Sequence, residues 1–329
     1  MPANLTPQYL SAEKRYREAR EDAEKLRYLE EMIRLLPKHK GTDHLFGDLK
    51  ARRSKLLGRL DQAKKQGKRE YAYGVERQGA GQVLLLGVPN SGKSSLLNAL
   101  SNANSPVGEY PFTTHKPYPG MMPYKDVHVQ VVDVAPVVAD ATEAWIQPLA
   151  RSADEILIVV DAADPDCLEH VETVLAELDR FKVTPCLYGD PQLRNEPVVP
   201  RTTLLVANKC DVHGAADDLA VLRELYADRF PILAVSSTEG AGLHDLVESM
   251  YASLRVIRVY TKAPGRPPDT DAPYVLREGA TVFDLAEEVH REIAESFKSA
   301  RMWGTEVHDG QLVGRDHVLA DGDVVEIHT

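Results

Sequence analysis

The sequence has few cysteines and no long apolar run, and these absences exclude several classes of protein. Its three cysteines, Cys167, Cys186 and Cys210, lie far apart and form no C-x-x-C pair, which argues against a disulfide framework or a zinc site. No stretch approaches the roughly 18 consecutive apolar residues that a membrane span needs. Residues 1–14 lack the apolar core of a signal peptide. We therefore expect a cytoplasmic protein with no membrane partner.

What the sequence does contain is typical of a globular chain with two or three domains. Of its 329 residues, 43% are apolar and 27% are charged, which is enough to build a buried core. The net charge is −11, yet residues 1–75 hold 18 basic and 11 acidic side chains. This asymmetry indicates either an arm that meets an anionic partner or the solvated face of a helical segment.

The first 75 residues are predicted to form a basic helical hairpin. Thr6-Pro7 is a helix start, and apolar residues recur at spacings of three and four from Ala12 to Leu36. Pro37 ends this helix, and a second helix is predicted from Thr42 to about Gln66. The short connection favours an antiparallel pair whose basic residues point outward.

A parallel sheet is predicted for the second domain, residues 76–254, where short aliphatic runs alternate with helical stretches. Continuous aliphatic strands separated by helices are typical of a parallel-rich α/β sheet with helices on both faces. Met121–Tyr124 closely precedes a further strand, which predicts one antiparallel edge pair. The other predicted strands are Val83–Leu86, Val127–Val132, Ile156–Val160, Thr203–Ala207 and Ile232–Val235.

Residues 255–329 are predicted to form a third, compact domain of strands around one helix. The predicted helix runs from Val282 to about Phe297, and the predicted strands are Val256–Tyr260, Tyr274–Leu276 and Val324–His328. From Arg255 onward there are 9 basic and 14 acidic residues. Such an acidic surface does not favour contacts with phosphates.

A phosphate-binding loop follows the first strand of the second domain. Gly87-Val-Pro-Asn-Ser-Gly-Lys-Ser94 matches G-x-x-x-x-G-K-[ST] between a strand and a helix. Its glycines let backbone N–H groups turn toward phosphate oxygens, and the helix N-terminus adds partial positive charge. Lys93 is expected to reach the β- and γ-phosphates, and Ser94 to ligate Mg²⁺. The predicted nucleotide contacts here are Gly87, Pro89, Asn90, Ser91, Gly92, Lys93, Ser94 and Ser95.

A second motif predicts guanine as the base. Asn208-Lys-Cys-Asp211 follows a predicted strand, and a carboxylate there accepts hydrogen bonds from the ring N–H and the exocyclic amine of guanine. Adenine offers no such pair of donors, so an ATPase would leave Asp211 partly unpaired at a cost. Ser236-Ser237-Thr238 ends the next strand and is placed to offer N–H groups to the guanine carbonyl. Asn208, Lys209, Asp211, Ser236, Ser237 and Thr238 complete the predicted nucleotide contacts.

Together these motifs make residues 82–254 resemble a translation-factor-type GTPase domain. The whole chain is similar to the Obg-like branch, and most of all to the developmentally regulated GTP-binding proteins. The resemblance implies GTP and GDP as ligands, Mg²⁺ as cofactor and GTP hydrolysis as the reaction. Tyr110-Pro-Phe-Thr-Thr-His115 resembles the first switch of that branch. By this resemblance Thr114, rather than Thr113, would ligate Mg²⁺ and act with Lys93 in catalysis, while His115 either positions a water molecule or has no such role.

A potassium site is a hypothesis that rests on Asn90. In related GTPases, an asparagine at this place in the loop helps to hold a potassium ion against the phosphates. No glutamine follows the second switch of this chain to orient the attacking water. This absence favours a cation that offsets the charge of the transition state. The alternative is that Asn90 merely tolerates an unusual backbone angle.

The second switch departs from the family pattern D-x-x-G. Asp133 can still reach Mg²⁺ through water, but Val134-Ala135-Pro136 follows it, and proline has no N–H. The donor that senses the γ-phosphate is therefore missing, and such a bond is worth about 1.5–3 kcal/mol. We expect a slow GTPase whose discrimination between GTP and GDP is reduced about 10- to 100-fold. The alternative is a non-catalytic guanine-nucleotide module that scaffolds a protein partner.

Both ends of the chain also resemble known families. Residues 256–329 resemble the TGS domain, a small ubiquitin-like β-grasp unit, and no adenylation motif accompanies it as a synthetase would require. The TGS family implies contact with RNA or the ribosome, whereas the acidic composition leaves a protein partner equally open. The matching segments are Ile257–Lys262, Leu276–Val282, Phe297–Gly304 and Asp316–Val325.

The basic hairpin resembles the start of the developmentally regulated GTP-binding proteins in the segments Lys38–His44 and Leu49–Lys55. Its run from Lys38 to Arg69, with 11 basic and 3 acidic residues, makes it the expected contact to ribosome or RNA. In that family a further domain is usually inserted in the GTPase domain. Only about 74 residues separate Pro136 from Asp211 here, so we expect that insertion to be absent.

Overall fold

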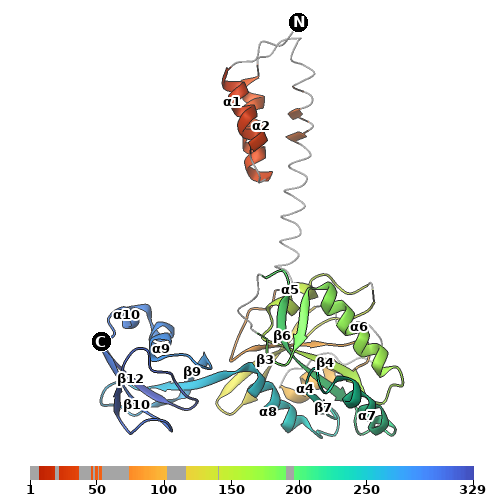
Figure 1. Ribbon diagram of the computed structural model, residues 1–329, viewed down its shortest axis with the longest axis vertical. Coiled ribbons are helices and arrows are strands. Elements are labelled where there is room, and N and C mark those ends of the chain that lie inside the picture. Colours follow the sequence, from red (N-terminus) through yellow and green to blue (C-terminus); the bar gives the residue numbers. More distant parts are fainter. Residues whose placement is uncertain are drawn as a thin grey trace. The chain divides into compact units, whose positions relative to one another are not determined.

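The structure, a computed structural model, describes residues 7–18, 22–36, 46, 49–50, 52–53, 74–101, 116–139, 141–189 and 196–329. The chain divides into two compact units, residues 1–74 and residues 75–329, which Figure 1 shows in ribbon form. Among the residues described, no helix combines the length and the apolar character needed to cross a bilayer.

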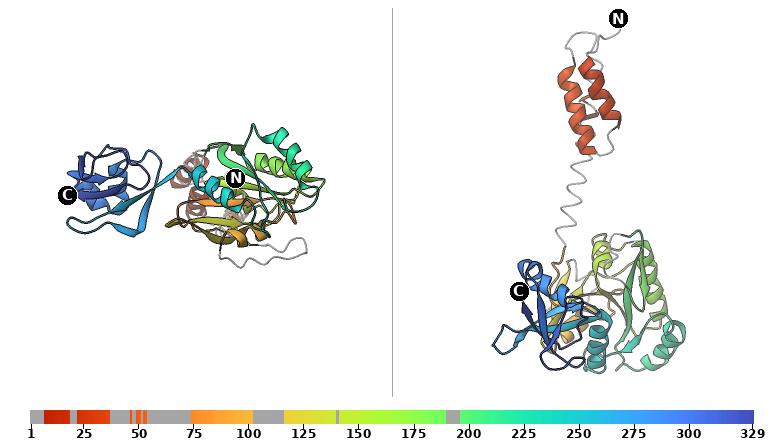
Figure 2. Two further views of the ribbon diagram at one scale, coloured as in Figure 1. Left: turned by 90° about the horizontal axis from the view of Figure 1, so that it is seen from below. Right: turned by 60° about the vertical axis from the view of Figure 1, so that its left-hand side comes forward.

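Between residues 7 and 36 of the first unit, the structure describes two helices where the sequence predicts one. Helix α1 (Pro7–Glu18) and helix α2 (Asp22–Leu35) lie side by side (Figures 1 and 2). Folding back lets Tyr9 of α1 pack in one apolar cluster with Leu29 of α2, whereas a single continuous helix would leave that stripe in water. Arg15 pairs with Glu31 across the two helices at 3.0 Å. Most of the second predicted helix, Thr42 to Gln66, lies outside the described residues.

The second unit is built on a mixed sheet of seven strands in the part of the chain described. The strand order is β2-β3-β1-β4-β6-β5, and β7 pairs with β6. All pairs are parallel except β2–β3, so the predicted α/β class and its antiparallel edge pair are confirmed. Strand β5 was not predicted, because its sequence Val-Thr-Pro-Cys has no aliphatic run. The strands are β1 (Gln82–Leu86), β2 (Tyr118–Tyr124), β3 (Val127–Asp133), β4 (Glu155–Asp161), β5 (Val183–Cys186), β6 (Val199–Asn208) and β7 (Ile232–Ala234).

Helices cover both faces of this sheet. Val83 and Leu85 of β1 pack in one apolar cluster with residues of α4 and α8, while Leu84 and Leu86 are buried on the opposite face. Side chains alternate between the faces of a strand, so full burial of four successive residues requires a helical layer on each side. The helices are α4 (Lys93–Leu100), α5 (Ile146–Ser152), α6 (Cys167–Arg180), α7 (Ala215–Tyr226) and α8 (Leu243–Leu254).

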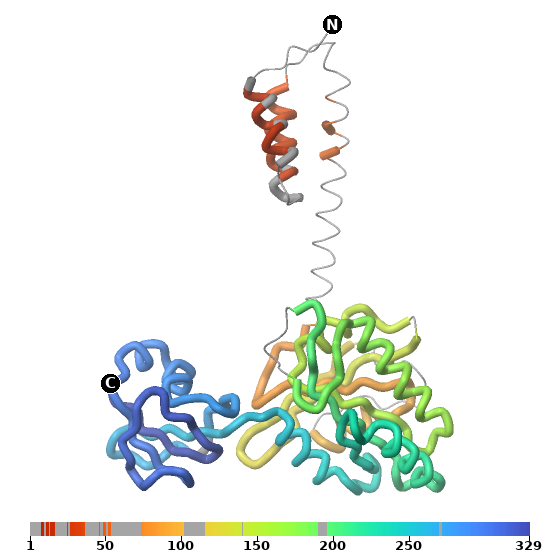
Figure 3. Tube along the Cα trace, in the orientation of Figure 1, coloured from red at the N-terminus to blue at the C-terminus, as the bar shows by residue number. Residues whose placement is uncertain are grey.

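The C-terminal residues form a second, smaller sheet with one helix packed on it, as predicted. Its order is β11-β10-β12-β8-β9, and α9 buries Val282 and Leu285 in its core; Figure 3 draws these C-terminal residues as the blue part of the tube. The predicted helix to Phe297 is instead interrupted at His290, whose backbone is extended and whose ring accepts a hydrogen bond from the Glu292 N–H at 3.2 Å. The elements are β8 (Val256–Thr261), β9 (Asp269–Arg277), α9 (Val282–Val289), α10 (Arg291–Glu295), β10 (Ser299–Trp303), β11 (Gln311–Val313) and β12 (Val324–His328).

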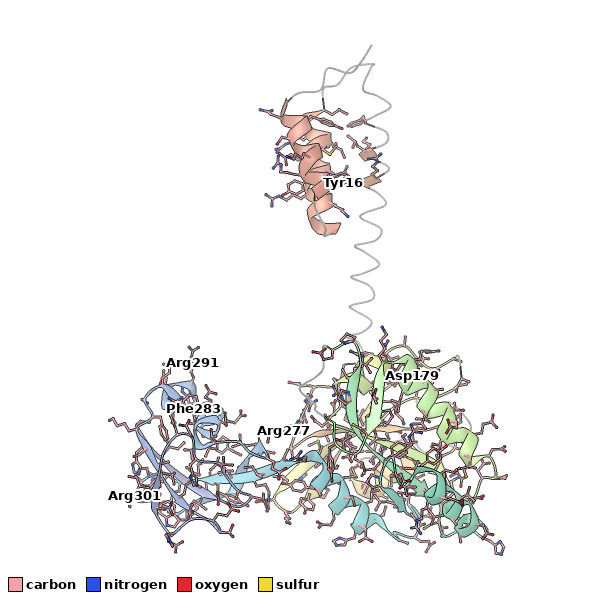
Figure 4. The ribbon with its side chains drawn as sticks, in the orientation of Figure 1. Tyr16, Asp179, Arg277, Phe283, Arg291 and Arg301 are labelled. Atoms are coloured by element: carbon pink, nitrogen blue, oxygen red, sulfur yellow. The ribbon has the colours of Figure 1, made fainter. Side chains whose placement is uncertain are left out.

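Charged side chains join this smaller sheet to the larger one. Arg258 of β8 contacts Asp126, in the β2–β3 turn, at 2.6 Å and Asp321 at 2.8 Å, and the Tyr260 hydroxyl also donates to Asp126. Although burial opposes it, hydrogen bonds from Tyr260 and Arg258 hold the pKa of Asp126 below its ordinary value. Arg277, labelled in Figure 4, makes a second connection by donating to the Leu254 carbonyl at 3.0 Å.

Glu155, the first residue of β4, is a fully buried carboxyl group. Its Oε1 accepts a hydrogen bond from the Ser253 hydroxyl at 2.6 Å, while Oε2 has no hydrogen-bond partner among the described residues. Burial raises the pKa of Glu155 well above its ordinary value of 4.5; the Ser253 hydrogen bond opposes this shift and the charge of Asp154 adds to it. The folded protein therefore keeps this proton to a higher pH than the unfolded chain does.

Glu155→Gln should stabilise the protein at neutral pH. Because the folded-state pKa is raised, the contribution of Glu155 is fully present below about pH 4.5 and is lost as the pH rises through the folded-state value. A neutral glutamine avoids this loss, so we expect the free energy of unfolding at pH 7 to rise by about 1–2 kcal/mol. Urea titrations at pH 4 and pH 7, with the exposed Glu143→Gln as control, measure it. An equal gain at both pH values would contradict the buried, protonated carboxyl.

Candidate functional site

The phosphate loop between β1 and α4 can be built only with glycine at two positions. Gly92 caps α4 with a left-handed backbone, φ 91°. A Cβ at Gly92 would strike the amide nitrogen of Asn208, and a Cβ at Gly87 would strike the carbonyl oxygen of Val159. The loop therefore lies directly against β4 and against the predicted base-binding motif.

Lys93 is folded over this loop. Its Nζ donates to the carbonyl oxygens of Gly87 at 2.9 Å and Val88 at 3.0 Å. Burial lowers the pKa of Lys93 to about 8, against the opposing effect of Asp133. The Ser91 hydroxyl is also buried and has no hydrogen-bond partner among the described residues. A buried ammonium and an open hydroxyl in a glycine-rich loop are suited to a polyanion, which would compensate the desolvated charge.

The predicted metal ligands Ser94 and Asp133 lie together. Strand β3 pairs with β1, so that Asp133 stands opposite Leu85 at the edge of the phosphate loop. The Ser94 hydroxyl donates to Oδ2 of the buried Asp133 at 2.6 Å. A hydroxyl and a carboxylate oxygen are the ligand types that Mg²⁺ prefers, so this donor set fits the ion. The third predicted ligand, Thr114, lies outside the described residues.

Asn208 connects the base motif to the phosphate loop. It is fully buried at the end of β6; its Nδ2 donates to the Ser91 carbonyl at 3.2 Å and its Oδ1 accepts from the Ser237 N–H at 3.2 Å. In the same turn, the hydroxyl oxygens of Ser236 and Thr238 lie 3.1 Å from each other. Asp211 is exposed. Residues more than 100 positions apart thus meet at one edge of the sheet.

The remaining predicted contacts also lie at this edge. Pro89, Ser94 and Ser95 are partly buried. Asn90 is exposed and has a left-handed backbone, φ 62°, so the backbone role named as the alternative for Asn90 is present. A role in holding potassium stays a prediction. Thr113 and His115 of the first switch lie outside the described residues.

The segment after Asp133 holds a feature that sequence reasoning missed. Val134, Ala135 and Val137 are buried, and the Val137 N–H donates to the carbonyl of Gly87 at 3.0 Å. The first N–H after Pro136 is therefore bonded to the phosphate loop itself. The valines that follow β3 could have indicated this burial. The hydrogen bond from Val137 to Gly87, however, depends on tertiary structure.

A second missed residue is Asp161, at the end of β4. It stands opposite Asn208 in the β4–β6 pairing, and its Oδ2 accepts from the Lys209 Nζ at 2.5 Å. The sequence signal was an aspartate at the carboxyl end of a buried strand, where ligand sites of parallel sheets lie.

Two protein families match the two sheets of the second unit. The family described as "50S ribosome-binding GTPase" matches residues 82–188, which include the phosphate loop. The TGS domain family matches residues 257–329, which include the smaller sheet. The resemblances stated from the sequence are confirmed at both places.

Relatives align with almost the whole chain. It is 30% identical to an uncharacterized GTP-binding protein of Methanocaldococcus jannaschii, over 92% of each chain. It is 28% identical to the developmentally-regulated GTP-binding protein 1 homolog of Dictyostelium discoideum, over 92% of this chain and 98% of that one. Ribosome-interacting GTPase 1 of Saccharomyces cerevisiae is 27% identical, with the same coverage. The first alignment is 362 residues long, so that relative holds residues absent from these 329.

A solved structure has the same fold. The GTP binding protein from Pyrococcus horikoshii OT3 superposes with a TM-score of 0.53 at 18% identity, over 75% of this chain and 99% of that one.

Proposed function

Since this chain belongs to the Obg-like GTPases and is homologous to the developmentally regulated GTP-binding proteins, we propose that it is a slow, Mg²⁺-dependent GTPase that acts with the ribosome or with RNA. The chain binds GTP and hydrolyses it, as its family does. The observation that carries the site is the double hydrogen bond of Asn208, which ties the phosphate loop to the base-binding turn. The assignment of individual residues below is part of the proposal.

Different residues of the site bind the phosphates, the base and the metal ion. The N–H groups of the phosphate loop and Lys93 bind the phosphates, and the ammonium balances the charge that develops during transfer. Asp211 accepts from the guanine edge, and the Ser236–Thr238 turn donates to its carbonyl. Bound Mg²⁺ would be held by Ser94, Asp133 and Thr114 and would supply positive charge to the β- and γ-phosphates. No described side chain is placed as a general base, which supports a slow intrinsic rate.

Pro136→Gly should restore the γ-phosphate sensor. The variant regains the D-x-x-G pattern and a backbone N–H at residue 136, while Val137 keeps its bond to Gly87. We expect the preference for GTP over GDP to rise by about tenfold or more, the value of one hydrogen bond to a charged oxygen. Titration of both nucleotides by fluorescence measures the ratio.

The matched control is Pro136→Ala, which also supplies an N–H but without the flexibility of glycine. If the restored N–H at residue 136 senses the γ-phosphate, both variants gain preference for GTP over GDP. If only the glycine variant gains, backbone freedom is the cause, and no gain in either would show that another group already senses the γ-phosphate.

The basic hairpin is proposed to meet the ribosome or RNA. Its support is the basic run from Lys38 to Arg69 and the similarity to the yeast relative, which is named a ribosome-interacting GTPase. Charge reversal at Arg52, Arg53 and Lys55 should reduce cosedimentation with ribosomes, because each lost phosphate contact weakens binding. Arg53 also pairs with Glu30 at 2.8 Å, so Glu30→Gln is the control that breaks this pair without reversing charge. Unchanged cosedimentation would favour a protein partner, with the acidic TGS unit as its docking site.

GTP turnover measured in potassium and in sodium buffer tests both the hydrolytic activity and the proposed use of K⁺. GTP hydrolysis is measured with and without ribosomes, in K⁺ and in Na⁺ buffer. A higher rate in K⁺ would support the potassium role proposed for Asn90, and equal rates would remove it. Hydrolysis no faster than that of a Lys93→Ala variant would favour the second candidate, a nucleotide-sensing scaffold.

A further inference from the structure

One carboxylate at the nucleotide edge has no part in the mechanism proposed above. Asp161 is the last residue of β4, and its side chain is 17% exposed. Its Oδ1 accepts from the Ala163 N–H at 3.0 Å, and its Oδ2 accepts from the Lys209 Nζ at 2.5 Å. The Ala162 N–H donates to the Asn208 carbonyl at 2.9 Å. Both oxygens are thus engaged, and the backbone fixes Asp161 beside the base motif.

Lys209 is held in a conformation that L-residues rarely adopt. Its φ is 61°, in the left-handed region that disfavours side chains other than those of Asn and Asp. The neighbouring backbone is fixed by the Cys210 N–H, which donates to the Val235 carbonyl at 3.1 Å, and by the Val212 N–H, which donates to the Lys209 carbonyl at 3.0 Å. A strained residue in a fixed loop is typical of a functional position.

The stem of Lys209 runs along the phosphate loop. Its Cε lies 4.0 Å from where a Cβ on Gly92 would be, and its Nζ ends on Asp161. The end of the stem therefore lies between Gly92 of the phosphate loop and Asp161 at the end of β4. Because Asp161 neutralises the ammonium, Lys209 is poorly suited to bind phosphate, a task that Lys93 already performs.

We propose that Asp161 is a positioning residue for guanine recognition. It anchors the Lys209 ammonium, so that the methylene stem forms a fixed apolar wall for the purine ring whose edge is bound by Asp211. A free lysine side chain would lose much rotamer freedom when a ring packs on it. Asp161 imposes that order before the ligand arrives and thereby raises the affinity for the base. This inference rests on the proposed function and concerns the base, not the phosphates.

The test compares a ligand with a base and a ligand without one. In the full-length protein, Asp161→Asn should weaken GDP binding about tenfold and change the affinity for inorganic pyrophosphate less than about twofold, both by calorimetry. Asp164→Asn is the control, because it removes a charge from the same loop, where the Asp164 oxygens contact the Asp166 N–H and His170 rather than Lys209. Equal losses for GDP and pyrophosphate would overturn the positioning role, since they would indicate a distorted phosphate loop.

A double-mutant cycle with Lys209→Met shows whether Asp161 acts through Lys209. The proposal requires that Asp161→Asn has no further effect on GDP affinity in the Lys209→Met background. A tenfold loss in both backgrounds would overturn it. Should Asp161→Asn fail to fold, Lys209→Met alone, which also removes the anchored ammonium, should weaken GDP binding about tenfold, and an unchanged GDP affinity in that variant would also overturn it. A wild-type protein that binds pyrophosphate but not GDP would refute the proposed function itself.

Discussion

Asp211→Asn should turn this protein from a guanine binder into a xanthine binder. In the proposed site, the carboxylate of Asp211 accepts two hydrogen bonds, from the ring N–H and the exocyclic amine of guanine. An asparagine presents one acceptor and one donor, which leaves the amine facing a donor. Sites built on paired hydrogen bonds reject a mismatched ligand strongly, so we expect GDP affinity to fall about 100- to 10,000-fold. Xanthine carries a carbonyl oxygen where guanine carries the exocyclic amine. Xanthosine nucleotides should therefore bind the variant in place of guanosine nucleotides.

Competition titrations with GDP, xanthosine diphosphate (XDP) and ADP measure this change in base preference. Asp211 is exposed, so the variant should fold as the wild type does, and its affinity for inorganic pyrophosphate should be unchanged. Asp217→Asn, on the first turn of α7, is the control for a lost charge nearby. If ADP rather than XDP gained affinity, the interpretation of the base motif would be wrong.

The candidate nucleotide site could be predicted from sequence because its parts are local. Gly87 to Ser94 must follow a strand and begin a helix, and Asp133 and Asn208 each end a buried strand. In a parallel sheet these ends meet at one edge, so three separate motifs predict one site. The Ser94–Asp133 and Asn208–Ser91 contacts follow from that geometry.

Other features depend on contacts that no local pattern encodes. No proline or glycine separates α1 from α2, and the chain turns because Tyr9 gains burial against Leu29. Strand β5 contains Pro185 and is recognised only by its pairing with β6. The bond from Val137 to Gly87 needs two distant backbones in register. In each case tertiary burial or pairing outweighs local propensity.

Pro136 and Val137 together change what the second switch can do. In the family pattern a glycine N–H is available for the γ-phosphate, whereas here the nearest N–H already bonds to Gly87 and the flanking side chains are buried. A segment packed in this way moves at a cost, because it must expose apolar surface. The first switch and β2, which follows it, are therefore the better candidates to respond to the nucleotide state.

Lys93→Ala should abolish GTP turnover and leave the empty protein at least as stable as before. Removing a charged group that acts on the transferred phosphate costs about 100- to 1,000-fold in rate. Lys93 is 6% exposed, and burial lowers its pKa to about 8, so the charge of its ammonium opposes folding at neutral pH. Alanine removes that cost together with two hydrogen bonds to loop carbonyls.

Phosphate release and thermal unfolding separate these two effects. We expect the variant to lose hydrolysis and the rise in melting temperature that GDP causes in the wild type, because ligand stabilisation depends on affinity. Its melting temperature without nucleotide should be unchanged or higher. Lys298→Ala, an exposed lysine of the C-terminal unit, should behave as wild type. Hydrolysis that persists in Lys93→Ala would place the activity outside the phosphate loop and contradict the assignment of the site.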